Sequence, residues 1–271
     1  TQSRSSAASD VYKRQIYIMD TLFKITAVLG ALAWMPQIIK WIVSWLRKPK
    51  LNIICDNEAQ VGYIAFGSVL NVNLSFISKH KSSLVENMEL IIKDNNNSTY
   101  NLNWAWYGET YYELKAPFAS ATMGKQQKAI AFVSYRDALV EKLVGFHSVY
   151  FREKKKELIN KINQLIENQK YTGNINVDTI KQSSEYIDLM RLCDDSIIWK
   201  KGSYTASCKV YIAGNKSPFI YNFKFSLTET DISNLKSNIK LAKLIIEKSY
   251  FPDENKIEDN WLWASPTIEK L

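Results

Sequence analysis

The sequence predicts a mainly β protein with helical insertions: an immunoglobulin-like antiparallel β-sandwich preceded by one N-terminal transmembrane helix. Three observations lead to this prediction. An apolar run of 22 residues lies near the N-terminus, at residues 25–46. Roughly seven short strand-like segments follow it, a density typical of a β-sandwich. Helical periodicity then interrupts the strands, which return near the C-terminus as two more segments before a last helix.

The first fifteen residues are set aside as a non-native leader. Residues 1–15 read TQSRSSAASDVYKRQ, with no apolar periodicity and a run rich in Ser and Ala. The segment resembles the translated tail of a sequencing-library adapter, and such scars are excluded from fold reasoning. The natural start is then expected at Met19. The alternative is a genuine flexible N-terminal tail.

Residues 16–48 are predicted to form a membrane anchor helix. The apolar run within it reads ITAVLGALAWMPQIIKWIVSWL and carries a single charge, Lys40. A helix of this length is about 33 Å long, and the hydrocarbon layer of a bilayer is about 30 Å thick. Pro36 is tolerated in a membrane span, and Trp41 and Trp45 suit the membrane interface.

Two other readings of the apolar run remain open. The first is a cleaved signal peptide, because residues 31–33 form an A-x-A pattern after a short apolar stretch. The apolar run continues well past Ala33, which favours an anchor over cleavage. The second is a buried helix of a soluble protein, which would have to accommodate Pro36 and several tryptophans in a compact core.

The charges that flank the span predict its orientation. Asp20 and Lys24 before the span cancel. The basic residues after it are Arg47, Lys48 and Lys50. The positive-inside rule therefore places everything after residue 46 in the cytoplasm, as the C-terminal part of a single-pass protein of the cell membrane. A reducing compartment also fits the three cysteines, which have no disulfide or zinc spacing.

One face of the predicted span carries small and polar residues at alternating spacings of four and three. These residues are Thr26, Gly30, Ala33, Gln37, Lys40 and Ser44. In lipid, helices associate through small residues that allow close approach and through polar residues that hydrogen-bond across the contact. We expect self-association or pairing with a partner helix through this stripe. The alternative is that the stripe arises by chance and Lys40 extends to the interface.

Residues 49–271 are predicted to form one cytoplasmic β-sandwich domain. The clearest strand is VLNVNLSFI, at residues 69–77, in which apolar and polar side chains alternate. Apolar periodicity then predicts a helical insertion around residues 136–193. Strands return at residues 203–213 and 218–227, and Thr228 opens a capping box for a closing helix at residues 229–249.

Motifs that would identify an enzyme or a metal site are missing from the sequence. His80 is expected in a polar turn and His147 on a helix face, and neither has a second ligand at metal spacing. We therefore predict no metal, no cofactor and no catalytic residue. Two weaker candidates are the Glu109–Glu113 pair and the run Cys193-Asp194-Asp195, which is more typical of a polar helix end.

Two clusters are candidate recognition surfaces. Trp104, Trp106 and Tyr111 form a candidate aromatic face for a sugar or a peptide, because Trp104 and Trp106 are expected on the same side of a strand. Core packing of these tryptophans is the alternative. The run at residues 152–156 is basic but interleaved with Glu, which is typical of ion pairs on a solvated helix.

Composition narrows the function classes. The chain has 271 residues, 35 Lys+Arg, 27 Asp+Glu and a net charge of +8. The basic residues are mostly Lys, so we expect no nucleic acid as a partner. The expected partners are a membrane and a protein or second copy. The function predicted is a non-enzymatic membrane-tethered interaction or sensor module. The alternatives are a membrane-acting effector whose transmembrane helix oligomerises and an enzyme with an unsignalled site.

Overall fold

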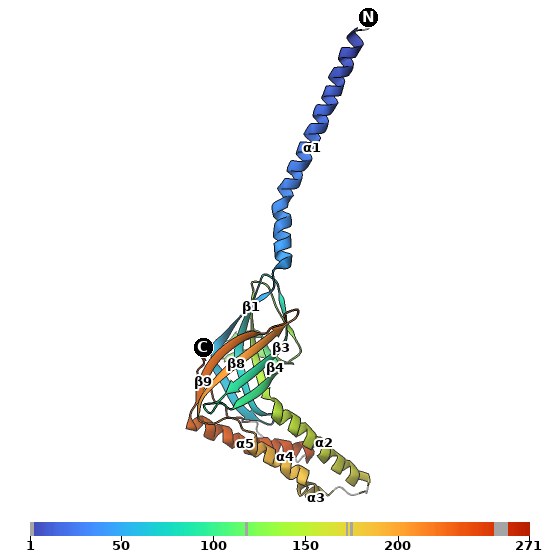
Figure 1. The fold of residues 1–271 in the computed structure, drawn as a ribbon. Coiled ribbons are helices and arrows are strands. Elements are labelled where there is room, and N and C mark those ends of the chain that lie inside the picture. The colour runs from blue at the N-terminus through green and yellow to red at the C-terminus, as the bar shows by residue number, and fades with distance from the viewer. Residues whose placement is uncertain (1–2, 117–118, 172, 174–175, 252–259) are drawn as a thin grey trace. The chain divides into compact units, whose positions relative to one another are not determined.

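The computed structural model describes residues 3–116, 119–171, 173, 176–251 and 260–271. The chain divides into two compact units, residues 1–49 and residues 50–271 (Figure 1). The first unit is one helix, and the second contains all the strands and the remaining helices. Each unit is described by itself.

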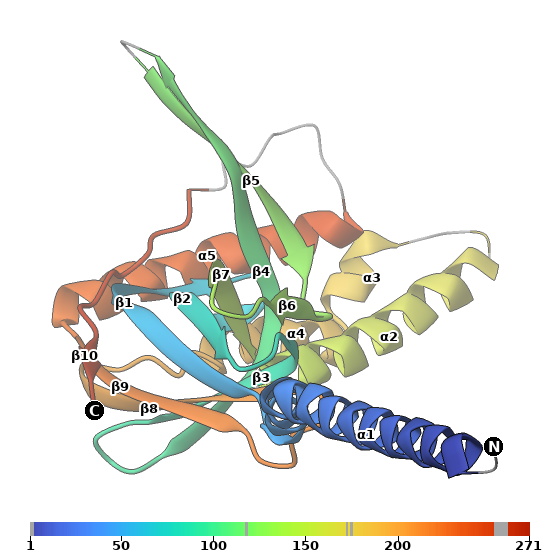
Figure 2. The same cartoon turned by 90° about the horizontal axis from the view of Figure 1, so that it is seen from above.

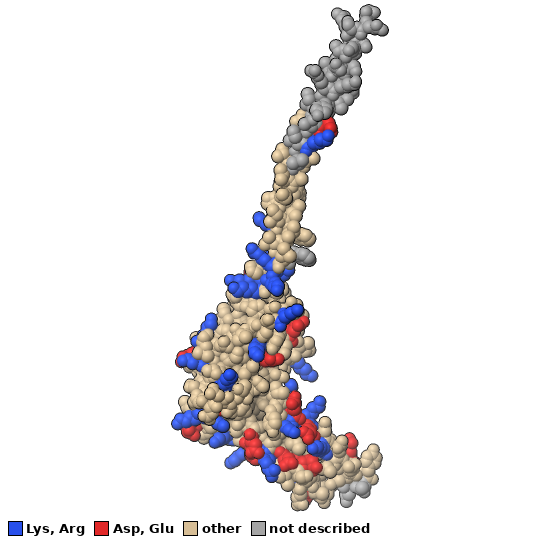
Figure 3. Space-filling model, in the orientation of Figure 1, with Lys and Arg blue, Asp and Glu red and all other residues tan. Residues whose placement is uncertain are grey.

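Helix α1 runs from Ser3 to Leu46 and contains Pro36. Its segment Leu22–Val43 is long and apolar enough to cross a membrane, and none of it is buried. The described surface of this segment is almost wholly uncharged (Figure 3). The expectation of one N-terminal apolar helix of spanning length is therefore confirmed. The helix also includes most of the predicted leader.

The second unit begins with seven strands. They are β1 (Lys50–Ile64), β2 (Gly67–Lys79), β3 (Ser83–Lys93), β4 (Thr99–Ala116), β5 (Ala119–Lys128), β6 (Phe132–Ser134) and β7 (Leu139–Ser148). Three more follow the helical segment, namely β8 (Gly202–Ile212), β9 (Phe219–Leu227) and β10 (Glu269–Lys270). All ten belong to one antiparallel sheet with the order β1-β2-β7-β4-β3-β8-β9-β10, while β5 pairs with β4 and β6 with β3.

The C-terminal segment joins the two ends of this sheet. The amide of Ala264 donates to the carbonyl of Val61 in β1 at 2.9 Å, and the amide of Val61 donates back at 2.8 Å. The same segment continues into β10, which pairs with β9. The sheet is therefore barrel-like, and the predicted mostly antiparallel β architecture is confirmed. The immunoglobulin-like sandwich is not confirmed, because the strands form one continuous sheet.

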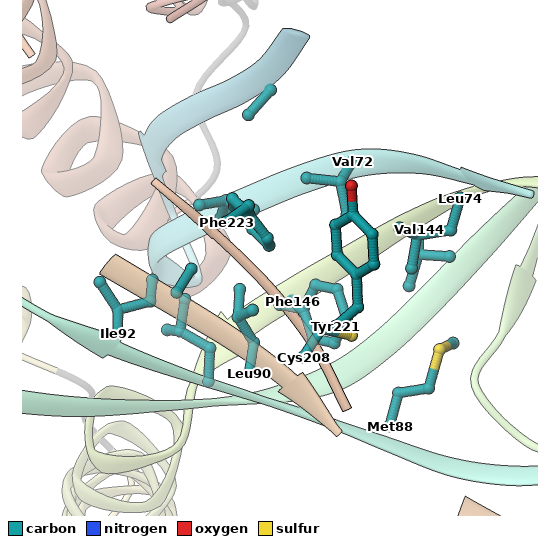
Figure 4. Close-up of a cluster of buried hydrophobic side chains, with 14 of the residues drawn as sticks. Val72, Leu74, Met88, Leu90, Ile92, Val144, Phe146, Cys208, Tyr221 and Phe223 are labelled. Carbon is teal, nitrogen blue, oxygen red and sulfur yellow. The ribbon is translucent and has the colours of Figure 1, made fainter. Parts of the chain in front are cut away.

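The interior of the barrel is the main hydrophobic core. Alternation along β2 buries Leu70, Val72, Leu74 and Phe76 within it, as the sequence predicts. Figure 4 shows side chains from several strands converging on this interior. They include Val72, Leu74, Met88, Leu90, Ile92, Val144, Phe146, Cys208, Tyr221 and Phe223.

Four helices cover one end of the barrel and share a second, smaller core. They are α2 (Val149–Tyr171), α3 (Val177–Lys181), α4 (Ser184–Asp195) and α5 (Glu229–Tyr250). Their buried residues include Phe151, Ile162 and Leu189. Acidic and basic side chains are mixed over their outer surface (Figure 3). The capping box at the start of α5 is confirmed, with Thr228 and Asp231 bonding reciprocally.

The first part of the predicted helical insertion is a strand. Residues 139–148 form β7, which pairs with β2 on one side and β4 on the other. Apolar residues at 139, 143 and 146 fit a helical period, but Val140, Val144 and Phe146 also fit a period of two. The segment forms a strand because it pairs with the edges of both β2 and β4, which lie on either side of it in the sheet. Helix therefore begins only at Val149.

Strands β4 and β5 form a long hairpin that extends beyond the rest of the sheet (Figure 2). Pairing of β4 with β7 ends at Gly108, whereas its pairing with β5 continues to Ala116. A β-bulge lies between Trp104 and Trp106. Because a bulge adds one residue to the strand, it changes which face the following side chains occupy.

Candidate ligand-binding site

The helix stripe is described for five of its six residues. Thr26, Gly30, Ala33, Gln37 and Lys40 are all exposed, and the side chain of Ser44 lies outside the described residues. The Thr26 hydroxyl donates to the carbonyl of Leu22 at 2.9 Å, so its polar group is satisfied within the helix. Association through the stripe stays a prediction.

The predicted flanking residue Lys50 lies at one end of the barrel, where β1 begins. Lys50 pairs with Lys79 across the β1–β2 ladder. Arg136 forms a β-bridge with Ser78 at the same end. The β8–β9 turn lies at this end too, because the amide of Ala213 donates to the carbonyl of Leu84 near the start of β3. We call this the β1 end. It gathers Lys50, Lys79, Lys81, Arg136 and Lys216 with the exposed apolar side chains Tyr135 and Leu139.

The predicted aromatic face is divided by the bulge in β4. Trp104 is buried in the barrel core, where its ring packs against Phe132. Trp106 instead lies over Gly145, whose missing side chain makes room for the indole ring. Since Val144 and Phe146 point inward, Gly145 and Trp106 lie on the outer face. The expectation of a shared face is therefore wrong for these two tryptophans. The side chain of Tyr111 lies outside the described residues.

Glu109 belongs to a polar network at the edge of the core. Its carboxylate forms an ion pair with Lys142 and accepts a hydrogen bond from the Gln127 amide at 3.1 Å. The Lys142 ammonium lies 5.4 Å from the centre of the Tyr107 ring. Both carboxylate oxygens are therefore occupied. The side chain of Glu113 lies outside the described residues, so a pair of catalytic carboxylates is not tested.

The run at the end of α4 does not assemble a nucleophile. Cys193 is buried, and burial raises the pKa of its thiol to about 11. Asp194 turns away to an ion pair with Lys243, at 2.6 Å. A thiol with a raised pKa is a poor nucleophile at neutral pH. The described residues also contain no cluster of three or more His, Cys, Asp or Glu side chains that could hold a metal.

The two histidines occupy different settings. His80 is exposed in the β2–β3 turn, as predicted, with a positive φ of 73°. His147 lies on β7, so its predicted helical placement is wrong. Its ring stacks on Phe66 of the β1–β2 turn, with the ring centres 5.6 Å apart and the planes at 13°.

A pocket of about 310 Å³ lies beside this aromatic stack. The first three turns of α2 supply its other side. The lining consists of Phe66, His147, Phe151, Arg152, Lys155, Lys156 and Ile159. The Lys155 ammonium donates to the carbonyl of Ala65 at 2.7 Å and lies 5.4 Å from the centre of the Phe66 ring. The β1–β2 turn is thus tied to α2 at the pocket.

The electrostatics of this pocket are unusual in two respects. Burial, followed by the nearby Arg152 guanidinium, lowers the pKa of His147 to about 4, so the ring is neutral at pH 7. Burial also lowers the pKa of Lys155. Titratable groups perturbed in this way cluster at functional sites more often than elsewhere. The pocket is therefore the strongest candidate site on the described surface.

Two larger hollows lie on the outside of the sheet. One, of about 870 Å³, is bordered by β3, β4, the start of α2 and residues 195–200, and contains the carboxylates Glu89, Glu153 and Asp195. The other, of about 980 Å³, crosses β1, β2, β7 and β4 and contains Trp106. Both are broader and more polar than the pocket beside Phe66.

The sequence does not predict that Phe66 belongs to the candidate site. Phe66 stands alone in a turn between two strands, and nothing in its neighbourhood along the chain predicts a histidine beside it. The basic run at residues 152–156 is evident in the sequence, but its interleaved Glu residues predict a solvated face. Lys154 does pair with Glu157 at 3.1 Å, whereas Arg152, Lys155 and Lys156 line the pocket.

Comparisons with known proteins give little further information. No family model matches the chain, and no curated protein matches it. Among solved structures, the chain is similar to a family 123 glycoside hydrolase from Clostridium perfringens that acts on glycolipid glycans, with 10% identity and a TM-score of 0.30. The match covers 67% of this chain and 28% of that protein, so the chain spans less than a third of its length. A similarity at this level carries no argument about function.

Proposed function

We propose that this protein is a non-enzymatic, membrane-tethered sensor module: α1 anchors the chain, and the barrel recognises a ligand on the cytoplasmic side. One observation carries the proposal. A helix with an exposed apolar surface of spanning length is followed, after three residues, by a barrel with a core of its own. A soluble protein rarely leaves so large an apolar surface in water.

The short connection holds the barrel close to the membrane. Residues 47–49 separate α1 from β1, and an extended chain from Leu46 to Lys50 reaches at most about 14 Å. The start of β1 therefore stays within this distance of the end of α1, which lets the β1 end contact the lipid headgroups. Its cations attract anionic lipid, each contributing about 1 kcal/mol near the surface. The exposed ring of Tyr135 suits the membrane interface.

The candidate pocket is placed well for a sensor. It lies at the β1–β2 turn, whereas the β1 end lies at the start of the same strand. The length of β1, 15 residues, separates the two ends of the barrel. A ligand dissolved in the cytoplasm can then reach the pocket while the β1 end rests on the membrane.

Removing residues 1–48 tests the anchor. We expect the full-length protein in the membrane pellet, extractable only with detergent, and the truncated protein in the soluble fraction with a cooperative unfolding transition. The barrel should fold alone because its core contains no residue of α1. Full-length protein that is soluble without detergent would falsify the anchor, and a C-terminal reporter found outside the cytoplasm would overturn the orientation.

The truncated protein also tests the β1 end. It should cosediment with vesicles that contain phosphatidylserine and not with neutral vesicles. Lys79→Gln with Arg136→Gln should weaken this binding by about thirtyfold, since two charges contribute about 2 kcal/mol. The matched control is Lys236→Gln with Lys240→Gln, which removes two exposed charges from α5. Equal loss in both double variants would show a non-specific charge effect and refute a specific contact of the β1 end with anionic lipid.

A further inference from the structure

The pocket beside Phe66 has a chemistry that specifies a ligand class, and the inference drawn from it rests on the proposed sensor function. Three cationic side chains line a volume of about 310 Å³, and no acidic side chain lines it. Binding sites for small molecules begin at about this size. Within the described part of the chain, Arg152 and Lys156 have no ion pair with a carboxylate. The pocket therefore favours an anion.

The donors of the pocket suit a phosphate group. Lys155 uses one of its three N–H groups on the carbonyl of Ala65 and keeps two for a ligand. Arg152 contributes a planar guanidinium, which binds two oxygens of a phosphate at once. His147 is neutral at pH 7 and adds a ring nitrogen to the same wall without adding charge.

The apolar part of the pocket is flat and held in place. Phe66 is 57% exposed although it stacks on His147. Gly67 has a φ of 85°, a conformation that glycine adopts without strain, and the Phe151 ring occupies the space that a side chain there would need. The turn that carries Phe66 is therefore fixed against α2. An exposed ring held in this way offers a surface on which another aromatic ring can stack.

We propose that this pocket binds a small organic phosphate whose phosphate group is attached to a flat aromatic ring. Arg152, Lys155 and Lys156 hold the phosphate oxygens, and the ring packs against Phe66. The volume excludes a long chain or a folded partner. The ligand chemistry could be presented by a free metabolite or by a lipid headgroup, and the experiment separates the two because its probes are soluble.

The test is isothermal titration of the full-length protein in a neutral detergent with three probes. Phenyl phosphate has both parts of the ligand, cyclohexyl phosphate has the same charge on a puckered ring, and inorganic phosphate has no ring. We expect saturable binding of phenyl phosphate, about tenfold weaker binding of cyclohexyl phosphate, and weaker binding still of inorganic phosphate. Saturable binding of these soluble probes supports a free metabolite, whereas the absence of saturable binding of phenyl phosphate would overturn the proposal.

Variants separate the two halves of the pocket. Phe66→Leu should weaken phenyl phosphate about tenfold and leave cyclohexyl phosphate unchanged. Arg152→Gln and Lys156→Gln should weaken both. The controls are Tyr135→Leu, an exposed ring at the β1 end, and Lys154→Gln on the same helix. Equal affinity for the two organic phosphates, or no effect of Phe66→Leu, would refute the proposal. Because detergent replaces the membrane, failure of the anchor does not change these outcomes.

Discussion

Two tryptophans of α1 and the buried Trp199 of the barrel have opposite environments. Trp34 and Trp41 in α1 are 68% and 70% exposed, whereas Trp199 in the barrel is 1% exposed and donates its indole N–H to the carbonyl of Gly62 at 2.8 Å. A helix satisfies its backbone internally and can present apolar side chains outward on every side, which suits lipid. A closed sheet turns its apolar side chains inward. Any need for a membrane therefore arises from α1 alone, and the barrel should be stable without one.

The largest expected effect comes from replacing a buried and an exposed tryptophan by alanine, each in a separate variant. Trp199→Ala should lower the free energy of unfolding of the barrel by about 3–5 kcal/mol, because it removes a large buried side chain and leaves a cavity. Trp34→Ala should leave that free energy unchanged. Chemical denaturation of the full-length protein in detergent, followed by circular dichroism, measures both. A loss of stability in Trp34→Ala comparable with that in Trp199→Ala would contradict this difference between the two units.

The second prediction concerns the contribution of barrel closure to the free energy of unfolding. The Asn238 side chain of α5 donates to the carbonyl of Leu262 at 2.7 Å and accepts from the amide of Leu262 at 3.0 Å. Asn238→Ala leaves both backbone groups without this partner and should cost about 2 kcal/mol.

The control for Asn238→Ala is Ser237→Ala, an exposed neighbour whose hydroxyl bonds only within α5. Its unfolding midpoint in urea should match that of the parent protein. If Asn238→Ala also unfolds at the parent midpoint, the segment after residue 260 does not contribute to the stability of the barrel.

The smallest effect is expected from pH. The pKa of His147 is about 4 in the folded protein and about 6.5 in an unfolded chain, so the unfolded state binds a proton more readily. Stability is therefore complete above pH 6.5 and falls as the pH drops toward 4, by about 1–2 kcal/mol for a ring that is partly exposed. Urea denaturation at pH 7 and pH 4.5 measures the loss.

Two variants identify the group responsible. His147→Gln should remove this part of the pH dependence, and His80→Asn, a change in an exposed turn that tolerates positive φ, should keep it. The truncated and full-length proteins should lose the same stability, because His147 lies in the barrel. A pH dependence that disappears with the helix would assign the titration to α1 instead.

Local patterns predicted much of the architecture. The apolar length of α1, the alternation in β2 and the capping box at Thr228 are each encoded within about ten to twenty neighbouring residues, and each matches the structure. The immunoglobulin-like arrangement is not confirmed. The sheet is barrel-like because Val61 pairs with Ala264, a contact between residues far apart in the sequence. No local pattern encodes a contact across that distance.

The candidate site was hidden from the sequence for the same reason. Phe66 and His147 meet because β2 pairs with β7, which places Val69 opposite His147. If residues 139–148 are predicted as helix, the pairing of β2 with β7 is not predicted. The stacking of Phe66 on His147 then cannot be predicted either. The tryptophans of β4 illustrate a second obstacle. One additional residue between Trp104 and Trp106 reverses the alternation, and a bulge has no reliable signal in its own sequence.

Closure of the barrel by a distant segment also sets an order of events during synthesis. Val61 cannot pair with Ala264 until the ribosome has translated some two hundred further codons, whereas α1 is complete before β1 has been made. If α1 inserts as proposed, it can therefore enter the membrane while β1 still has an unpaired edge. Exposed strand edges are templates for aggregation, and distant pairings form slowly. Early attachment of each nascent chain to the bilayer would keep those open edges apart until the last strand arrives.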